Sequence, residues 1–247
     1  MSFVPAPGRA PMRVVLRHQT LLELRLTMRR GEALVLALGV PLLVLLGAGL
    51  TDVTRLPTED RLGWVAPGVL ALTVLSTAFT GQAITTGYER SYGVLKRLGA
   101  SPLTRGGLLA AKTGAIACLV LIQCTLLAAA AALAGWRPTI VHLPSAIAVT
   151  LLATAAYSGF ALLLASLLKP ETTTGLATLV YVVMLAAGGV MFEGFGPVEY
   201  VLPLAAHAEA LRDTLTAGRP VAGWTWLTLA AWGLIGPLLA ARHFRWE

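Results

Sequence analysis

Long, nearly uncharged apolar blocks recur along this chain and constrain its fold more than any other feature. A helix that crosses the hydrocarbon core of a bilayer needs about 20 consecutive apolar residues. Only 13% of the 247 residues are charged, roughly half of the usual share in soluble domains. The sequence therefore predicts an all-α polytopic membrane protein with six transmembrane helices, at residues 33–50, 64–84, 107–134, 143–168, 174–192 and 221–241.

The distribution of Lys and Arg predicts the orientation of these crossings. With the N-terminus inside, most of the 19 basic residues fall on inner segments, and the outer segments hold only Arg55, Arg61, Arg137, Arg212 and Arg219. Cytoplasmic loops of membrane proteins carry such an excess of positive charge. We therefore expect both termini in the cytoplasm. The net charge of +7 is then a topology signal, and no nucleic-acid partner is predicted.

Residues 1–32 precede the first crossing and form a separate region. Three prolines in "PAPGRAP" predict an extended lead, and "MRVVLRHQTLLELRLTMRR" predicts an amphipathic helix in which Val15, Leu22 and Leu26 share one face. A helix that mixes Arg with Leu and Val suits the cytoplasmic interface, with its arginines on lipid headgroups. A simple positive anchor for the first crossing and a specific docking element both remain open.

Signatures of catalysis are missing from the sequence. It contains no His-Glu-x-x-His, no Gly-x-Ser-x-Gly and no carboxylate pair within a crossing. The stretch "GGLLAAKT" approaches a phosphate-binding loop, but Ala111 occupies the position of the second glycine, which that loop needs for its backbone to approach phosphate. We expect the Lys112 ammonium to reach the lipid headgroups instead. No catalytic site, metal site or cofactor is predicted in this chain.

Ionisable groups are also scarce inside the predicted crossings. The polar groups there are mainly Thr, Ser and Tyr, with Gln123 and, near a helix end, Gln82. Proton-coupled and ion-coupled carriers usually keep ionisable residues at membrane depth. A hydrophobic substrate, or an energy source outside this chain, fits the pattern better than a proton relay.

The polar stretch "YERSYGVLKRLGASPLTR", residues 88–105, interrupts the apolar pattern. Residues 89–98 suit a short helix with an apolar ridge at Val94, Leu95 and Leu98, and a proline disfavours helix at the residue before it, Ser101. Such a helix on the cytoplasmic surface can press its ridge into a groove on a partner. An ordinary basic loop that follows the charge rule is the alternative.

The same stretch resembles the cytoplasmic loop of the ABC-2 type permeases, the membrane subunits of ABC transporters. The pattern E-[RK]-x-x-G-[TV]-L-x-x-L-x-x-[ST]-P-[LV]-x-R is met by Glu89, Arg90, Gly93, Val94, Leu95, Leu98, Ser101, Pro102, Leu103 and Arg105. A second stretch, "YVLPLAAHAEALRDTLTAG", is similar to the segment that follows the fifth helix in that family. Within the family, size and pattern most resemble the daunorubicin-type drug-export permeases.

The resemblance implies a coupling helix at residues 88–103, seated on a separate ATPase. It assigns polar contacts to Glu89, Arg90, Lys96 and Arg97, a buried ridge to Val94, Leu95 and Leu98, and further loop positions to Gly93, Ser101 and Pro102. It also implies that residues 1–32 hold a connecting helix beside the ATPase, with Arg17, Arg25, Arg29 and Arg30, and that residues 33–247 are the transmembrane domain.

On the outer side, the resemblance implies a re-entrant segment at residues 194–215. It places six polar side chains around the outer mouth: Glu193, Glu199, His207, Glu209, Arg212 and Asp213. Each of them is also open to interpretation as a solvated loop residue.

The function implied is ATP-driven export of a hydrophobic or amphipathic substrate, such as a drug or lipid, across a bacterial plasma membrane. The expected partners are a cytoplasmic ATPase subunit that carries the ATP and Mg²⁺, a second permease copy or a related permease, and membrane lipids. An ATP-independent carrier or channel is the alternative, and a membrane-embedded enzyme or assembly factor is disfavoured by the missing catalytic signatures.

Overall fold

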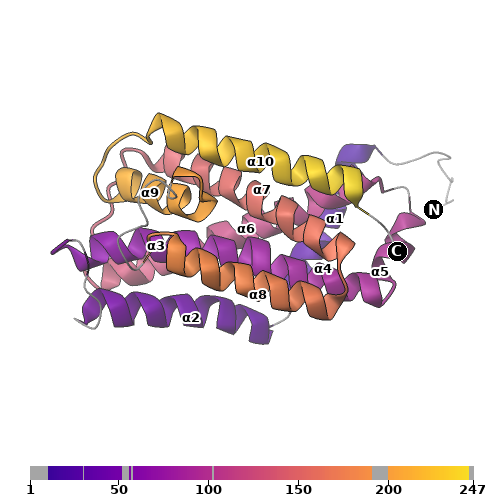
Figure 1. Ribbon diagram of the computed structural model, residues 1–247, viewed down its shortest axis with the longest axis horizontal. Coiled ribbons are helices and arrows are strands. Elements are labelled where there is room, and N and C mark those ends of the chain that lie inside the picture. The colour runs from indigo at the N-terminus through magenta and orange to yellow at the C-terminus, as the bar shows by residue number, and fades with distance from the viewer. Residues whose placement is uncertain are drawn as a thin grey trace, which may run out of the picture.

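The computed structural model describes residues 11–29, 31–51, 56, 58–101, 103–190 and 200–244, and every regular element within these ranges is a helix. Most of the helices lie side by side in an elongated bundle (Figure 1). Its long members are α2 (Gly31–Leu50), α3 (Arg61–Leu75), α6 (Arg105–Leu133), α7 (Leu143–Leu167), α8 (Pro170–Ala187) and α10 (Gly223–His243).

Five helical segments of the described chain are long and apolar enough to cross a membrane: Arg61–Ser91, Arg105–Leu133, Leu143–Leu167, Pro170–Ala187 and Gly223–His243. They coincide with five of the predicted blocks, which confirms a polytopic helical architecture. The first predicted block coincides with α2, whose described apolar stretch, Ala37–Leu50, is shorter than a full crossing. The sixth crossing therefore stays a prediction.

The second crossing is longer than the sequence predicted. After α3 the helix continues as a π-helical segment, η1 (Ser76–Gly81), and then as α4 (Gln82–Ser91). Glu89 and Arg90 consequently belong to the end of this long helix, and the expectation of one short helix over residues 89–98 is wrong.

A glycine makes the break between α4 and the next helix, α5 (Val94–Gly99). Gly93 has φ +70°, in the left-handed region, where a Cβ atom is unfavourable and glycine commonly ends a helix. The chain then turns into α6, whose first turn is capped by the Thr104 hydroxyl, 3.1 Å from the Gly107 nitrogen.

The core is centred on α3. Every side chain from Val65 to Leu75 is buried, as expected of a helix that is apolar on all sides. It packs against α2, α6 and the short helix α9 (Pro203–Leu215).

The helices α7 and α10 approach each other closely. A Cβ atom on Gly159 would lie 2.3 Å from the backbone nitrogen of Pro237 and 2.4 Å from the carbonyl carbon of Gly236. Small residues allow membrane helices to approach in this way. The sequence alone did not single out this glycine pair.

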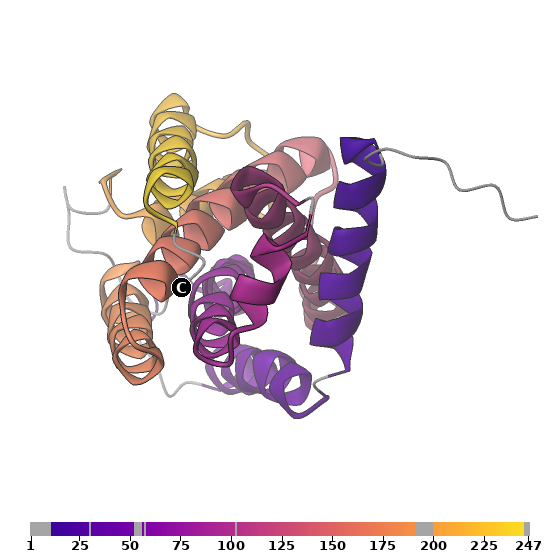
Figure 2. The ribbon, with the colours of Figure 1, turned by 90° about the vertical axis from the view of Figure 1, so that its right-hand side faces the viewer.

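The two ends of the bundle differ. At one end lie α5, the last turn of α10, and α1 (Met12–Met28), which packs against α6 (Figure 1). Figure 2 views the molecule from this end and shows α1 lying crosswise to the long helices. At the other end α9 packs beside α3, α7 and α10 (Figure 1). These are called the α5 end and the α9 end below.

Candidate functional site

A buried ion cluster joins three helices at the α5 end. The Lys112 ammonium of α6 lies 2.9 Å from a carboxylate oxygen of Glu23 on α1 and 2.6 Å from one of Glu89 on α4. The Lys112 side chain is only 4% exposed. The expectation that this ammonium reaches the lipid headgroups is therefore wrong, because two carboxylates hold it inside the protein.

The cluster ties the crosswise helix to the bundle. Glu23 is the buried residue of α1, and the Gln19 amide donates a hydrogen bond of 2.9 Å to its second oxygen. Removing one partner from a buried ion pair leaves an uncompensated charge and is strongly destabilising.

Arg90 makes a second internal connection. Its guanidinium donates hydrogen bonds to the carbonyl oxygens of Ala165 and Leu168, at 3.2 and 3.3 Å. These carbonyls lie at the C-terminal end of α7, where the helix dipole favours a cation. Glu89 and Arg90, both predicted to contact an ATPase, thus bind within the chain and fix the end of α4.

The short helix α5 is anchored by one leucine. Leu95 is 0% exposed and belongs to an apolar cluster with Leu103, Leu108 and Phe244, against which Leu98 also packs. The prediction that Leu95 forms part of a ridge toward a partner is therefore wrong, because its side chain is already buried within this chain.

The outward face of α5 is formed by other residues. Val94 is 38% exposed, and Lys96 and Arg97 are exposed beside it. Ser101 closes the turn by donating from its hydroxyl to the Leu98 carbonyl at 2.6 Å. Pro102 lies outside the described residues. We refer to Val94, Lys96 and Arg97 as the α5 face.

The arginines predicted for the connecting helix are exposed where the structure describes them. Arg17, Arg25 and Arg29 lie on the outer surface of α1, and Arg30 lies outside the described residues. Leu22 and Leu26, predicted to share one apolar face of this helix with Val15, are 47% and 45% exposed. The helix is turned so that Glu23 meets Lys112, and it presents leucines and arginines outward, as an interfacial helix does.

At the α9 end, the predicted outer-mouth residues separate into two groups. His207 is 0% exposed, and its Nε2 atom lies 3.2 Å from the Thr150 hydroxyl of α7. Its placement at an outer mouth is wrong, because the ring is packed inside the bundle. Glu193 and Glu199 lie outside the described residues.

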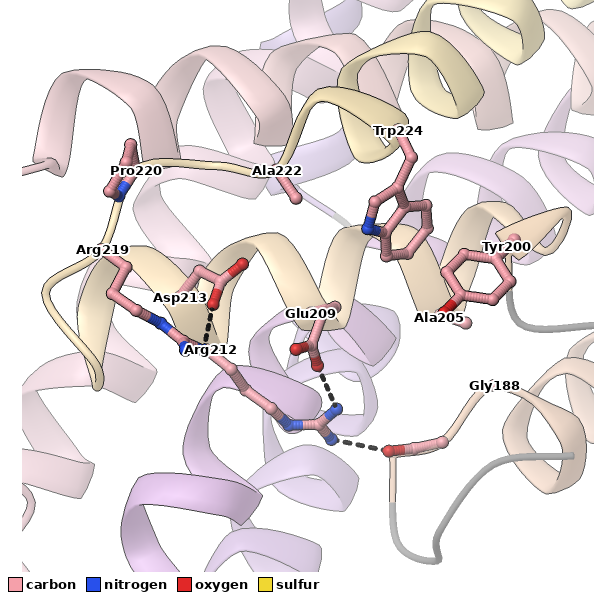
Figure 3. A pocket seen from close by; sticks show the side chains of 11 residues that line it. Gly188, Tyr200, Ala205, Glu209, Arg212, Asp213, Arg219, Pro220, Ala222 and Trp224 are labelled. Atoms are coloured by element: carbon pink, nitrogen blue, oxygen red, sulfur yellow. Dashed lines mark hydrogen bonds and ion pairs between the residues drawn. The ribbon is translucent and has the colours of Figure 1, made fainter. Parts of the chain in front are cut away.

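Glu209, Arg212 and Asp213 line a cavity of about 540 Å³, which Figure 3 shows from close by. The Arg212 guanidinium lies 3.8 Å from the centre of the Trp64 ring and donates a hydrogen bond of 2.6 Å to the Gly189 carbonyl. Its contact with Glu209 is longer, at 3.5 Å.

A second ion pair and two aromatic rings also line this cavity. Arg219 reaches Asp213 at 2.6 Å (Figure 3). Tyr200 and Trp224 pack edge to face, with ring centres 4.9 Å apart. Of the four charged residues that line the cavity, all but Arg219 are among those that the sequence placed at the outer mouth, and the contact with Trp64 was not anticipated.

Sequence reasoning also missed Glu23 as a partner of Lys112. A signal was present, because Glu23 is the only acidic residue in the first predicted helix and Lys112 is the only charged residue in the third apolar block. Two isolated opposite charges in apolar surroundings favour a mutual contact over separate exposure.

The fold defines a class: an α-helical membrane protein that crosses the bilayer several times, with charged residues gathered at the two ends of its bundle. The model of the family described as ABC-2 type transporter matches residues 21–215. The match covers most of the chain, and the protein belongs to this family, as the membrane permease component of an ABC transporter. Comparison with the curated proteins finds no match.

Proposed function

We propose that this chain is the permease subunit of an ATP-driven exporter that moves a hydrophobic or amphipathic molecule out of the cytoplasm or the inner leaflet. Membership of the ABC-2 family supports the permease role. The observation that carries the coupling assignment is the α5 face, where an internal leucine anchor holds Val94 and two cationic side chains outward at the end of the longest spanning segment.

The partner that fits this face is a separate ATPase subunit, which supplies the ATP and Mg²⁺. A complementary groove for Lys96 and Arg97 carries carboxylates around an apolar centre that takes Val94. Electrostatic complementarity of this kind sets register and association rate more than affinity.

The internal contacts provide a route for movement. A displacement of α5 acts on α4 through the Gly93 turn, on α6 and α10 through the Leu95 cluster, and on α1 through the ion cluster. In this proposal the elements move together when the ATPase closes. Packed elements with discrete arrangements are suited to such coupling.

A second permease completes the transporter in this proposal. The helix α8 is little buried, and Leu179, Val182 and Val183 are each more than half exposed. This apolar surface suits either bilayer lipid or a second copy. The positive-inside rule supports placing the α5 end in the cytoplasm of a bacterial cell.

The test is charge reversal on the α5 face. In the full chain purified gently from its native membrane, Lys96→Glu with Arg97→Glu is expected to remove most of the co-purifying ATPase and ATP-dependent export from vesicles. The matched control is Lys169→Glu with Arg242→Glu, which changes charge equally at two other exposed basic residues.

Wild-type-like ATPase association in the α5 variant would overturn the coupling assignment. Solute movement by the chain alone, without ATP, would favour the ATP-independent carrier or channel.

A further inference from the structure

A cavity of about 470 Å³ lies within the membrane part of this chain, between α2, the π-helical segment η1, α4 and α6. Glu23 and Lys112 of the ion cluster line it, as does Gln123. Gln123 follows Lys112 by about 16 Å along α6, at 1.5 Å per residue. The cavity therefore extends from the ion cluster toward the middle of the bundle.

The lining holds polar groups that the protein itself leaves without partners. Gln82 is 4% exposed and Gln123 and Thr86 are each 1% exposed. Within the described residues, neither amide atom of Gln82 has a hydrogen-bond partner, and the same holds for the amide nitrogen of Gln123 and the hydroxyls of Thr80 and Thr86. Buried polar side-chain atoms are bonded in the large majority of cases. A cluster of exceptions around one cavity requires an explanation.

One hydrogen bond orients the deeper part of this cluster. The Thr77 hydroxyl donates to the Gln123 carbonyl oxygen at 2.9 Å, which leaves the amide nitrogen of Gln123 available as a donor. Gln82 has three rotatable side-chain bonds, so its amide can turn toward a molecule in the cavity without a backbone shift.

The backbone is also unusual at this place. The π-helical segment covers residues Ser76 to Gly81 and contains no proline, and four of its residues line the cavity: Ser76, Thr77, Thr80 and Gly81. π-Helical turns inside α-helices are rare and occur frequently at functional sites. The irregular turn and the unpartnered polar groups thus coincide.

We propose that this cavity binds the transported molecule, and that the molecule is amphipathic, with neutral hydroxyl, carbonyl or amide groups on an apolar body and no acidic group. The unpartnered amides and hydroxyls match neutral donors and acceptors. Val40, Ile116 and Leu119 supply apolar lining. The Glu23 carboxylate lines one end of the cavity and already occupies the Lys112 ammonium, so an acidic group there would meet a like charge. This inference rests on the proposed export function and names its substrate class.

The acyl chain of an ordinary membrane lipid is a poorer occupant. A hydrocarbon chain offers no hydrogen bonds. It would leave the polar groups of Gln82, Thr86 and Gln123 buried without partners, and the free-energy cost of burying them would stay the same. Protection by a plain hydrocarbon would therefore contradict the proposal.

The test measures protection of a cysteine in the cavity. Thr80→Cys is placed in the full chain with Cys118→Ala and Cys124→Ala, in lipid nanodiscs, and its labelling rate with N-ethylmaleimide is measured. The probe is monododecanoylglycerol, which is neutral and carries two hydroxyls and an ester. At a probe level ten times its dissociation constant, labelling is expected to slow about tenfold.

Three comparisons make the result specific. Dodecanoate, with the same chain and an acidic head, is expected to protect much less. Hexadecane, which has no head group, is expected to give no protection. A cysteine at Leu43, which is 72% exposed on α2, is expected to label at the same rate with or without the probe.

Two variants remove polar groups from the cavity while keeping side chains of similar size. Gln82→Leu and Thr86→Val replace unpartnered polar side chains by apolar ones of similar size, which is neutral or stabilising for a fold. The expected result is an unchanged or raised Tm together with loss of most protection in Gln82→Leu and a smaller loss in Thr86→Val.

Equal protection by hexadecane, or full protection in a folded Gln82→Leu variant, would overturn the assignment. Equal protection by dodecanoate would overturn the substrate class. The assay needs no ATPase, so its failure is distinct from a failure of the α5-face variants to lose their ATPase.

Discussion

A largely buried cation lies at each end of the bundle, Lys112 at one and Arg212 at the other, and the two are held in different ways. Lys112, at the α5 end, is bound by carboxylates from two other helices at 2.9 and 2.6 Å. Arg212, at the α9 end, lies over the Trp64 ring and donates to a backbone carbonyl, with its carboxylate neighbour Glu209 at 3.5 Å and 41% exposed. Lys112 is therefore held mainly by opposite charges. Arg212 is held mainly by the fit of its planar guanidinium against an aromatic ring and a carbonyl oxygen.

This difference follows from what each end must do in the proposed mechanism. The α5 end connects α1, α4 and α6, the elements around the expected ATPase contact, and an ion cluster joins them at fixed points. The α9 end surrounds an open cavity, where a planar guanidinium can stack without closing the space (Figure 3). Arg serves in stacked sites better than Lys because its charged group is planar.

The largest effect is expected from Lys112→Met. The substitution removes the ammonium that the Glu23 and Glu89 carboxylates share, and breaking a buried ion pair in this way costs about 3–5 kcal/mol. The midpoint of thermal unfolding in nanodiscs measures the loss. The matched control adds Glu23→Gln and Glu89→Gln, which removes the uncompensated charge and is expected to recover much of the stability. A triple variant no more stable than Lys112→Met would contradict the charge-based account.

A smaller loss, about 1–2 kcal/mol, is expected from Arg212→Lys, because the positive charge stays while the stacking on Trp64 is lost. The same unfolding measurement applies. Arg219→Lys is the control, since its side chain is 68% exposed and exposed ion pairs contribute little. If the Arg212→Lys variant has the same unfolding midpoint as the unchanged protein, the contact of the planar guanidinium with Trp64 does not stabilise the α9 end.

Gly93→Ala tests the turn that sets the direction of α5. No atom lies within 4 Å of a Cβ at this position, so the expected loss of about 1–2 kcal/mol comes from the left-handed backbone alone. Co-purifying ATPase is expected to fall with it, because the α5 face is misdirected. Retained stability and full ATPase association would show that the turn tolerates a side chain.

The smallest effects are expected at two matched helix caps. Thr104 accepts from the Gly107 nitrogen at the start of α6, and Asp60 accepts from the Gly63 nitrogen at the start of α3, at the opposite end. Each change to Ala is expected to cost about 1 kcal/mol. Unfolding midpoints that differ strongly between the two variants would mean that one cap does more than complete its helix.

Much of the fold was predictable because membrane helices must be long and apolar. Residues 107–134 and 143–168 were predicted within two residues of the observed α6 and α7. The end of the second crossing was missed because polar residues 82–91 continue the helix once Glu89 and Arg90 find partners inside the protein. Hydropathy carries no information about such partners.

The candidate site was less predictable than the fold. The motif indicated that residues 88–103 form a special segment, but not that Leu95 points inward, since a six-residue helix shows too little periodicity to define its buried face. The polar cavity was also hidden. Gln82 and Gln123 are 41 residues apart in sequence, and only the packing of two crossings brings them to one space.

The most direct test of the central claim is photocrosslinking from the α5 face. A benzoylphenylalanine at Val94, in native membranes, is compared with one at Leu133, which is 92% exposed at the far end of α6. The account predicts an ATPase subunit crosslinked from Val94 and none from Leu133. No ATPase adduct from Val94, or equal yields from both positions, would contradict the claim that the α5 face receives the driving subunit.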